Sequence, residues 1–326
     1  MKKEKTRWFG IPKLFPYLKG YGRLVLADMI ALGFIGSAMD AVIPLFQQYA
    51  IDHFIADRTL AGLGAFVALY ILVMIVQTAT NCVSALAACK AEMYIGRDLK
   101  RVCFNHLQTL SFSYFNQNSV GYIHARVMSD TDKIATILAW GLMEAVWYVA
   151  YLALAIVMMF VLNWRLALCV MAIVPVLAVA SVYFQKKLVF HHRRVREQNS
   201  KITSGFNEGI TGAKTTKTLV IEEKMEREFR GLTGVMKRES VKEMHFRSLF
   251  MSTTAFAASA ALAVVLWQGG IITMRGAMLI GTLSVFVNYA QGMMEPIQWL
   301  VQVLSALTNV QVNVERFTKL METESD

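Results

Sequence analysis

The sequence predicts an all-α integral membrane protein with six transmembrane helices and two long helical extensions on the cytoplasmic side. Three observations support this fold class. The 326 residues are 56% hydrophobic and only 17% charged, whereas soluble domains carry about 25% charged residues. The apolar residues gather into six runs, each with room for the ~20 residues that cross a bilayer. Most basic residues lie before the first run or in two long connections between runs.

Residues 1–23 precede the first apolar run and are predicted to form an amphipathic segment in the membrane interface. Apolar side chains, among them Trp8, Leu14 and Tyr17, are interleaved there with lysines. A secretory signal places its apolar core directly after the first basic residues, but here the long run begins only near Leu24. No cleavable signal peptide is therefore predicted.

The predicted spans make up a transmembrane domain over residues 24–310, and residues 311–326 are expected to lead from it toward a further domain. Short connections follow the first, third and fifth spans, whereas 48 and 64 residues follow the second and fourth. These long connections contain few Gly or Pro residues, so they are predicted to continue the helices beyond the membrane as two arms. The spans are expected at 24–46, 63–88, 137–162, 166–184, 249–274 and 278–307.

The net charge of +10 indicates how the bundle is oriented. Of the 33 Lys and Arg residues, 28 lie before the first span or in the two long connections. Cytoplasmic segments next to spans are enriched in Lys and Arg, so both termini and both arms are predicted to be cytoplasmic in a multi-pass protein of the plasma membrane. Because the charge flanks membrane spans, a nucleic-acid partner is not expected.

No metal or redox site is predicted. None of the four cysteines belongs to a C-x-x-C pair, and they are interpreted as small packing residues. His191 and His192 stand beside Arg193 and Arg194. Because adjacent residues of a helix point in different directions, these four are predicted to form a solvated basic face and not a metal site.

Motifs in the middle of each long connection resemble those of a known family. Residues 113–134 read SYFNQNSVGYIHARVMSDTDKI, and residues 208–222 read EGITGAKTTKTLVIE. Their order and spacing resemble the first and second intracellular loops of ABC exporters. Ile51-Asp52 after the first span and Gly281-Thr282-Leu283 near the start of the sixth also fit that family.

The resemblance implies an ABC exporter transmembrane fold, in which the arm tips form short coupling helices that dock on ATPase domains. It implies a second transmembrane subunit, as a homodimer or heterodimer, and transport of an amphipathic substrate by alternating access. The residues expected to couple to the ATPase domain are Tyr114, Phe115, Asn116, Gln117, Gly212, Ala213, Lys214, Thr215 and Lys217.

A phosphate-binding loop is not predicted in this sequence. A loop of the type G-x-x-x-x-G-K-[ST] needs a Gly-Lys pair, and none is present. The segment Gly212-Ala-Lys-Thr imitates such a loop, but it follows a helical pattern and not a strand. We therefore expect this chain to bind no cofactor and to have no enzymatic activity alone. ATP and Mg²⁺ are expected on a nucleotide-binding domain, in the same polypeptide or in a separate one.

Four acidic residues fall within or near the predicted spans, where a charge is costly unless it faces a cavity or a partner. Asp28 and Glu144 lie near cytoplasmic ends and can reach the interface. Glu295 lies deeper and precedes Pro296, which is expected to kink the span. For Glu295, a cavity-facing role and a helix-packing hydrogen bond are equally supported. The candidate substrate path comprises Asp40, Glu295, Met293, Met294 and Trp299.

Two other functions stay open at this point. An ion-coupled secondary transporter would use Glu295 and Asp40, and a membrane scaffold would use the arms for binding alone. Secondary transporters often contain inverted repeats and broken midplane helices, and neither is evident in the sequence. A scaffold does not account for the ordered loop motifs. The exporter is therefore the favoured interpretation.

Overall fold

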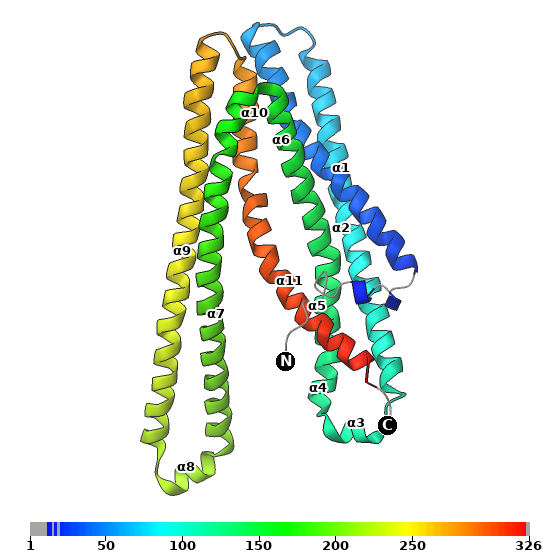
Figure 1. Cartoon of the computed structure of the whole chain (residues 1–326), viewed down its shortest axis with the longest axis vertical. Coiled ribbons are helices and arrows are strands. Elements are labelled where there is room, and N and C mark those ends of the chain that lie inside the picture. Colours follow the sequence, from blue (N-terminus) through cyan, green and yellow to red (C-terminus); the bar gives the residue numbers. More distant parts are fainter. Residues whose placement is uncertain (1–11, 15, 18–19, 324–326) are drawn as a thin grey trace. The chain divides into compact units, whose positions relative to one another are not determined.

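The computed structural model describes residues 12–14, 16–17 and 20–323, and every regular element within these ranges is helical. The chain divides into two units, which we describe separately. The first unit comprises Met1–Cys169 and Val264–Asp326, and the second unit comprises Val170–Ala263. Figure 1 shows the course of the chain through the helices.

The first unit contains most of the predicted spans and the first arm. Its helices and π-helical turns (η) are, in chain order, α1 (Gly20–Ala50), η2 (Ile51–Ala56), α2 (Leu63–Leu107), α3 (Phe112–Gln117), α4 (Val120–His124), η3 (Ala125–Asp130), α5 (Thr131–Thr136), η4 (Ile137–Gly141), α6 (Leu142–Met171), α10 (Ile280–Gly292) and α11 (Met294–Met321).

The second unit is a pair of long helices joined by a short one (Figure 1). It consists of α7 (Ile173–Thr211), α8 (Ala213–Leu219) and the larger part of α9 (Glu222–Met274), whose last turns belong to the first unit. α2, α7 and α9 have 45, 39 and 53 residues, which at 1.5 Å per residue is about 60–80 Å of helix. The helices therefore run far past the predicted spans, and the cytoplasmic location of these extensions stays a prediction.

Four helical stretches among the described residues are long and apolar enough to cross a membrane: Leu26–Ala56, Leu63–Leu107, Val120–Thr211 and Glu222–Met274. The third of these contains the third and fourth predicted spans, with a break in the helical geometry between them. Only Asn163 leaves the helical conformation there, with φ −159° and ψ 101°. Its Oδ1 accepts a hydrogen bond from the backbone N–H of Leu166 at 3.2 Å and so begins a new helical turn. The number of six spans stays a prediction.

The sixth predicted span is divided into two helices. α10 ends at Gly292 and α11 begins at Met294. In a continuous helix the carbonyl of Gly292 would accept a hydrogen bond from the backbone N–H of residue 296. Because Pro296 has no such N–H, this bond cannot form. The predicted irregularity near Pro296 is thus found about one turn before it, next to Glu295.

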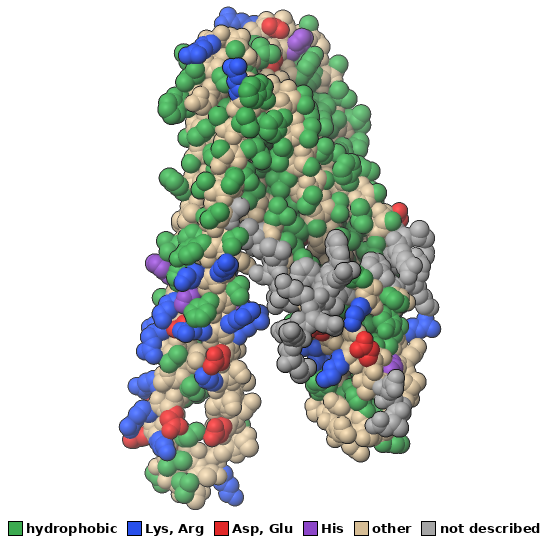
Figure 2. Space-filling model, viewed as in Figure 1, with side chains coloured by type: hydrophobic (Ala, Val, Ile, Leu, Met, Phe, Trp, Pro, Cys, Tyr) green, Lys and Arg blue, Asp and Glu red, His purple; other side chains and the backbone are tan. Residues whose placement is uncertain are grey.

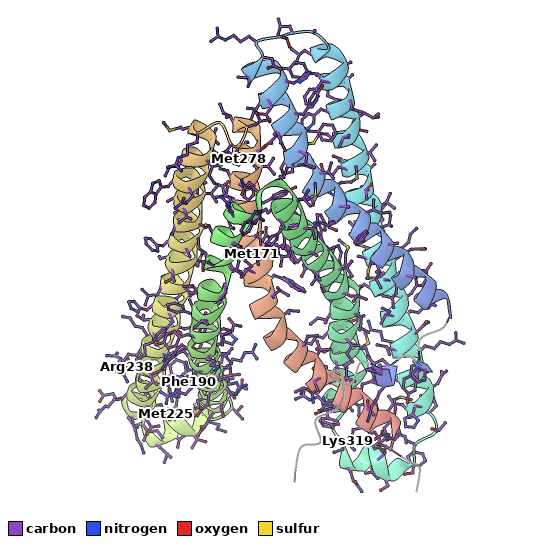
Figure 3. All side chains as sticks on the ribbon, turned by 45° about the horizontal axis from the view of Figure 1, so that its top comes forward. Met171, Phe190, Met225, Arg238, Met278 and Lys319 are labelled. Atoms are coloured by element: carbon purple, nitrogen blue, oxygen red, sulfur yellow. The ribbon has the colours of Figure 1, made fainter. Side chains whose placement is uncertain are left out.

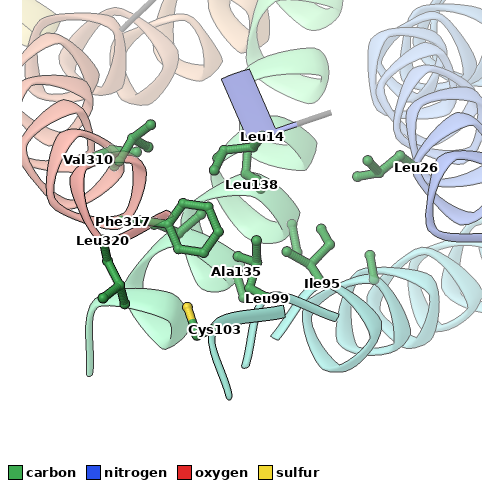
Figure 4. Close-up of a cluster of buried hydrophobic side chains, with 14 of the residues drawn as sticks. Leu14, Leu26, Ile95, Leu99, Cys103, Ala135, Leu138, Val310, Phe317 and Leu320 are labelled. Carbon is green, nitrogen blue, oxygen red and sulfur yellow. The ribbon is translucent and has the colours of Figure 1, made fainter. Parts of the chain in front are cut away.

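The main hydrophobic cluster of the first unit forms where α2, α5 and the end of α11 meet (Figure 4). Leu99 and Cys103 of α2 pack there with Phe317 of α11. Burial raises the pKa of the Cys103 thiol to about 12, as expected for a packing residue and not a reactive one. Leu14, 1% exposed, joins the same cluster and anchors the described part of the N-terminal segment.

Hydrogen bonds join η2 and α1 to the beginning of α10. Asp52 Oδ1 accepts a hydrogen bond from the backbone N–H of Gly281 at 2.7 Å, and Gln48 Nε2 donates to Thr282 Oγ1 at 3.0 Å. Gly281 lies in the first turn of α10, so Asp52 supplies both an acceptor and a negative charge at the positive end of that helix. Two further bonds continue the seam, from Asn288 to Gln47 and from Tyr289 to the carbonyl of Ala41.

In the second unit, α7 and α9 meet along a polar seam. Glu239 and Glu243 of α9 are 9% and 8% exposed. His191 Nδ1 lies 3.3 Å from a Glu239 oxygen, and His192 Nδ1 lies 3.0 Å from a Glu243 oxygen. The Lys242 ammonium, 2.9 Å from Glu239, holds the pKa of that carboxyl below its usual value.

The prediction of a solvated basic face was wrong for His191. Its ring is buried and stacks on Phe246, with ring centroids 5.1 Å apart. The residue faces the neighbouring helix because Glu239 and Phe246 supply it with an acceptor and an apolar surface.

Candidate functional site

The first arm ends in α3, which contains four of the predicted coupling residues. Tyr114 packs against the main hydrophobic cluster, and its ring lies edge-on to Phe115 with centroids 5.7 Å apart. Phe115 is 42% exposed, and Asn116 and Gln117 are exposed beside it. Phe112, which sequence analysis did not select, is 89% exposed. This tip therefore presents an aromatic surface that Tyr114 anchors to the bundle.

The second arm ends in α8, and Gly212 is the residue between α7 and α8. The predicted coupling residues Ala213, Lys214, Thr215 and Lys217 consequently share one helix of seven residues. Lys217 Nζ lies 3.0 Å from Glu222 Oε1 and ties α8 to the start of α9. The same lysine holds the pKa of Glu222 below its usual value. The segment that imitates a phosphate loop is thus the junction residue Gly212 followed by the first turn of α8, with no strand before it.

Two apolar side chains complete the second tip. Leu219 is 60% exposed and Val220 is 81% exposed. Val220 has φ 52° and ψ 47°, a left-handed conformation that β-branched residues rarely adopt. Sequence analysis missed Val220 because an apolar residue in an apolar chain carries no signal until its exposure is known.

A buried carboxylate ties the first arm to the end of α11. Asp130 is 3% exposed, and Arg126 Nη1 lies 2.6 Å from its Oδ2. Arg316 Nη1 of α11 lies 4.0 Å from the other oxygen of Asp130. Asp130 therefore connects the first arm to the end of α11, and removing either arginine would leave a buried charge less well compensated.

Three residues of the predicted substrate path occupy packing positions. Gln77 of α2 and Trp147 of α6 donate hydrogen bonds to Asp40, which therefore links α1 to both helices. Met293 and Met294 are 1% and 7% exposed, so they line no open surface in this conformation. Glu295 is exposed, and Trp299 is half-buried like Asp40.

Glu295 and Trp299 of α11 face Glu144 and Tyr148 of α6. The Tyr148 hydroxyl donates to Glu295 Oε1 at 3.0 Å, and Trp299 Nε1 donates to Glu144 Oε2 at 2.9 Å. The two aromatic rings lie 5.2 Å apart between their centroids. Both carboxylates are exposed, and neither pairs with a Lys, Arg or His among the described residues. We call these four residues the acidic aromatic cluster.

Indole N–H groups hold several carboxylates of the first unit. Tryptophan donates a hydrogen bond without carrying a charge, and its ring is compatible with hydrocarbon, so it can stabilise an acidic side chain within a span. Sequence analysis selected Asp40, Glu295 and Trp299 but could not pair donors with acceptors, because the two lie on different helices. Three such pairs are found among the described residues: Trp140–Glu92, Trp147–Asp40 and Trp299–Glu144.

Comparison with known proteins shows which family this chain is similar to. The ABC transporter transmembrane region, as a family, matches residues 26–297. YknV, an uncharacterised ABC transporter ATP-binding protein of Bacillus subtilis, is 27% identical over 97% of this chain and 52% of its own length. The ATP-dependent lipid A-core flippase of Vibrio cholerae is 21% identical over 99% of this chain and 55% of its own length. The chain thus spans about half the length of these relatives.

The family match covers most of the chain, and the helical arms described above agree with it. The chain therefore belongs to the family of ABC transporter transmembrane regions.

Proposed function

We propose that this chain is the transmembrane, or permease, part of an ATP-driven exporter that works by alternating access. The observation that carries the proposal is the continuity of the arms. α8 joins α7 and α9, and both of these helices run unbroken toward predicted spans. A rigid helix can transmit a displacement at its tip to the span that it continues.

The acidic aromatic cluster suits an amphipathic substrate, because the cluster offers negative charge and aromatic surface together. Its members are Glu144, Tyr148, Glu295 and Trp299. The name of the V. cholerae relative, a lipid A-core flippase, supports an amphipathic substrate as well. The positions of Asp40 and its donors, Gln77 and Trp147, favour a packing role for Asp40 over the ion-coupled alternative.

The proposal is tested by comparing the full chain with and without a nucleotide-binding domain, fused or separate, in sealed vesicles. We expect no magnesium-dependent ATP hydrolysis by the chain alone. Substrate transport should require the nucleotide-binding domain, with ATP on the side that exposes the arms, because both arms and both termini are proposed to be cytoplasmic. Uphill transport driven by a proton gradient alone would contradict the proposal and favour an ion-coupled transporter.

The arm tips should be needed for coupling but not for substrate binding. We expect Phe115→Ser to lower transport and the substrate stimulation of ATP hydrolysis by tenfold or more, because an exposed aromatic anchor contributes about 2 kcal/mol to an interface. Substrate affinity, measured by a binding titration, should stay within about twofold, since residue 115 lies on the arm. Phe104→Ser is the matched control, because Phe104 is 59% exposed on α2 but does not belong to the tip. Equal losses in the two variants would argue against a coupling role.

We propose that a second transmembrane subunit completes the transporter. The separation of α7 and α9 into a unit of their own supports a contact between this helix pair and a partner subunit. In a background without native cysteines, Val179→Cys on one copy is expected to crosslink to Ile71→Cys on another; both positions are exposed in this chain. Crosslinks found only when both cysteines share one chain would indicate a monomer.

A further inference from the structure

The second unit carries a dense group of basic residues where its helices continue past the predicted spans. Along α7 it begins two residues after predicted span 166–184, and along α9 it ends two residues before predicted span 249–274. All nine side chains are exposed, and Lys and Arg side chains gather on this part of the arm in Figure 2. We call them the basic patch: Lys186, Lys187, Arg193, Arg194, Arg196, Lys237, Arg238, Lys242 and Arg247.

Two of the three acidic residues of the same section face inward, whereas Glu197 is exposed and pairs with Lys201. Glu239 and Glu243 are buried in the seam between α7 and α9, where they contact His191 and His192. They pair with only three members of the patch, Lys242, Arg194 and Arg247. The other six have no carboxylate partner among the described residues. The outer surface of this section is therefore almost entirely cationic.

Exposed apolar side chains accompany the cations. Phe190 is 50% exposed, and the Arg194 guanidinium lies over its ring at 4.6 Å. On α9, Val241 and Met244 are 60% and 55% exposed between the basic residues. Figure 3 labels Phe190 on α7 and Arg238 on α9, which immediately precede His191 and Glu239 in the sequence. The surface thus alternates positive charge with groups that favour a hydrocarbon boundary.

The general enrichment of cytoplasmic segments in Lys and Arg does not account for the patch. Residues 186–197 and 237–247 hold nine Lys or Arg and three Glu, a formal charge of +6. The matching section of the first arm, residues 90–101 and 126–133, holds six Lys or Arg and four Asp or Glu, a charge of only +2. Several cations of the first arm are also paired with acids, as Lys100 is with Asp132 at 2.6 Å. The excess charge is specific to the second arm.

We propose that the basic patch binds the phosphate groups of anionic phospholipids in the leaflet from which the arms emerge. Unpaired ammonium and guanidinium groups recognise phosphate oxygens, and basic residues close to an anionic leaflet each contribute to membrane affinity. A soluble phosphate would have no use for Phe190, Val241 and Met244, whereas a lipid supplies glycerol and acyl groups beside its phosphate. This inference does not depend on the substrate or on transport.

The test is lipid retention by the purified full chain in detergent, measured by native mass spectrometry during titration with phosphatidylglycerol or phosphatidylcholine. Wild type is expected to retain phosphatidylglycerol in preference to phosphatidylcholine. The triple variant Lys186→Gln/Lys187→Gln/Lys237→Gln should weaken this retention at least tenfold, since each basic residue near an anionic surface contributes a factor of about five. The three substitutions are at exposed positions without a described ion pair, so the fold should persist, as a melting curve will verify.

The matched control is Lys90→Gln/Arg101→Gln/Lys133→Gln, which removes three exposed cations without a described ion pair from the first arm. It should keep the preference for phosphatidylglycerol within about twofold. Equal loss in both triple variants would overturn the proposal, because the attraction would then be general. Equal retention of phosphatidylcholine by wild type, or displacement of phosphatidylglycerol by millimolar inorganic phosphate, would overturn it too.

Discussion

Gly281→Ala is expected to destabilise the protein by about 3 kcal/mol or more, because α10 begins directly against α1 and η2. A Cβ atom at position 281 would lie 2.5 Å from the backbone oxygen of Gln48 and equally close to a carboxylate oxygen of Asp52. Either α10 moves away or Asp52 rotates and gives up its bond to the Gly281 N–H. Overpacking costs about 1–3 kcal/mol, and losing a hydrogen bond to a charged group costs about 1.5–3 kcal/mol.

The measurement is a thermal melting curve of the detergent-solubilised chain. Gly270→Ala is the control, since position 270 is also a helical glycine and a Cβ there would meet nothing within 4 Å. That variant should melt at or slightly above the wild-type temperature, because alanine restricts the unfolded chain more than glycine does. If the two alanine variants melt alike, α10 does not rest on Gln48 and Asp52 as closely as described.

The contact between Asp52 and Gly281 marks the limit of what the sequence could predict. Each residue belongs to a motif that sequence analysis recognised, after the first span and at the start of the sixth. The two residues are 229 positions apart, and their hydrogen bond depends on the register between α1 and α10. Register is fixed by tertiary packing, for which neither local motif contains a signal.

Long helices were more predictable because their signals are local. Apolar runs of span length indicated most of the helices, and the scarcity of Gly and Pro in the long connections indicated the arms. Between the third and fourth predicted spans the helix breaks at Asn163, whose backbone leaves helical geometry and whose side chain caps the turn that follows. Asparagine favours the start of a helix, so this signal is local too.

The candidate site was predictable in part for a similar reason. A carboxylate in an apolar run is conspicuous, so Asp40 and Glu295 could be selected from the sequence, and Trp299 was selected with them. Glu144 and Tyr148 could not be assigned to the same site, because the sequence does not show which helices face each other. The structure joins these two residues of α6 to Glu295 and Trp299 of α11 in one cluster.

Glu295→Gln is expected to lower kcat/KM for a singly cationic amphipathic substrate by tenfold or more and to leave a neutral analogue nearly unchanged. Two unit charges about 4 Å apart interact by about 4 kcal/mol at an effective dielectric constant of 20. Even if desolvation offsets most of this energy, the remaining 1.4 kcal/mol is a factor of about ten. Glutamine keeps the size of the side chain and still accepts the hydrogen bond from Tyr148.

Tyr148→Phe provides the control for the alternative, in which Glu295 only packs α11 against α6. This variant removes the 3.0 Å hydrogen bond but keeps both carboxylates, so transport of the cationic substrate should stay within about threefold of wild type. A packing role predicts the opposite pattern. Tyr148→Phe would then lower the melting temperature, Glu295→Gln would not because it keeps the hydrogen bond, and neither variant would distinguish cationic from neutral substrates.

Glu144→Gln extends the test to the whole acidic aromatic cluster. If Glu144 and Glu295 bind the same cation, each single variant still leaves one carboxylate for it beside the rings of Tyr148 and Trp299. The double variant leaves none. Because the two carboxylates would share one partner, the loss of transport of the cationic substrate, expressed as free energy, should differ in the double variant from the sum of the two single losses. Strictly additive losses would show that the two carboxylates act on separate ligands, and the cluster would then not be one site.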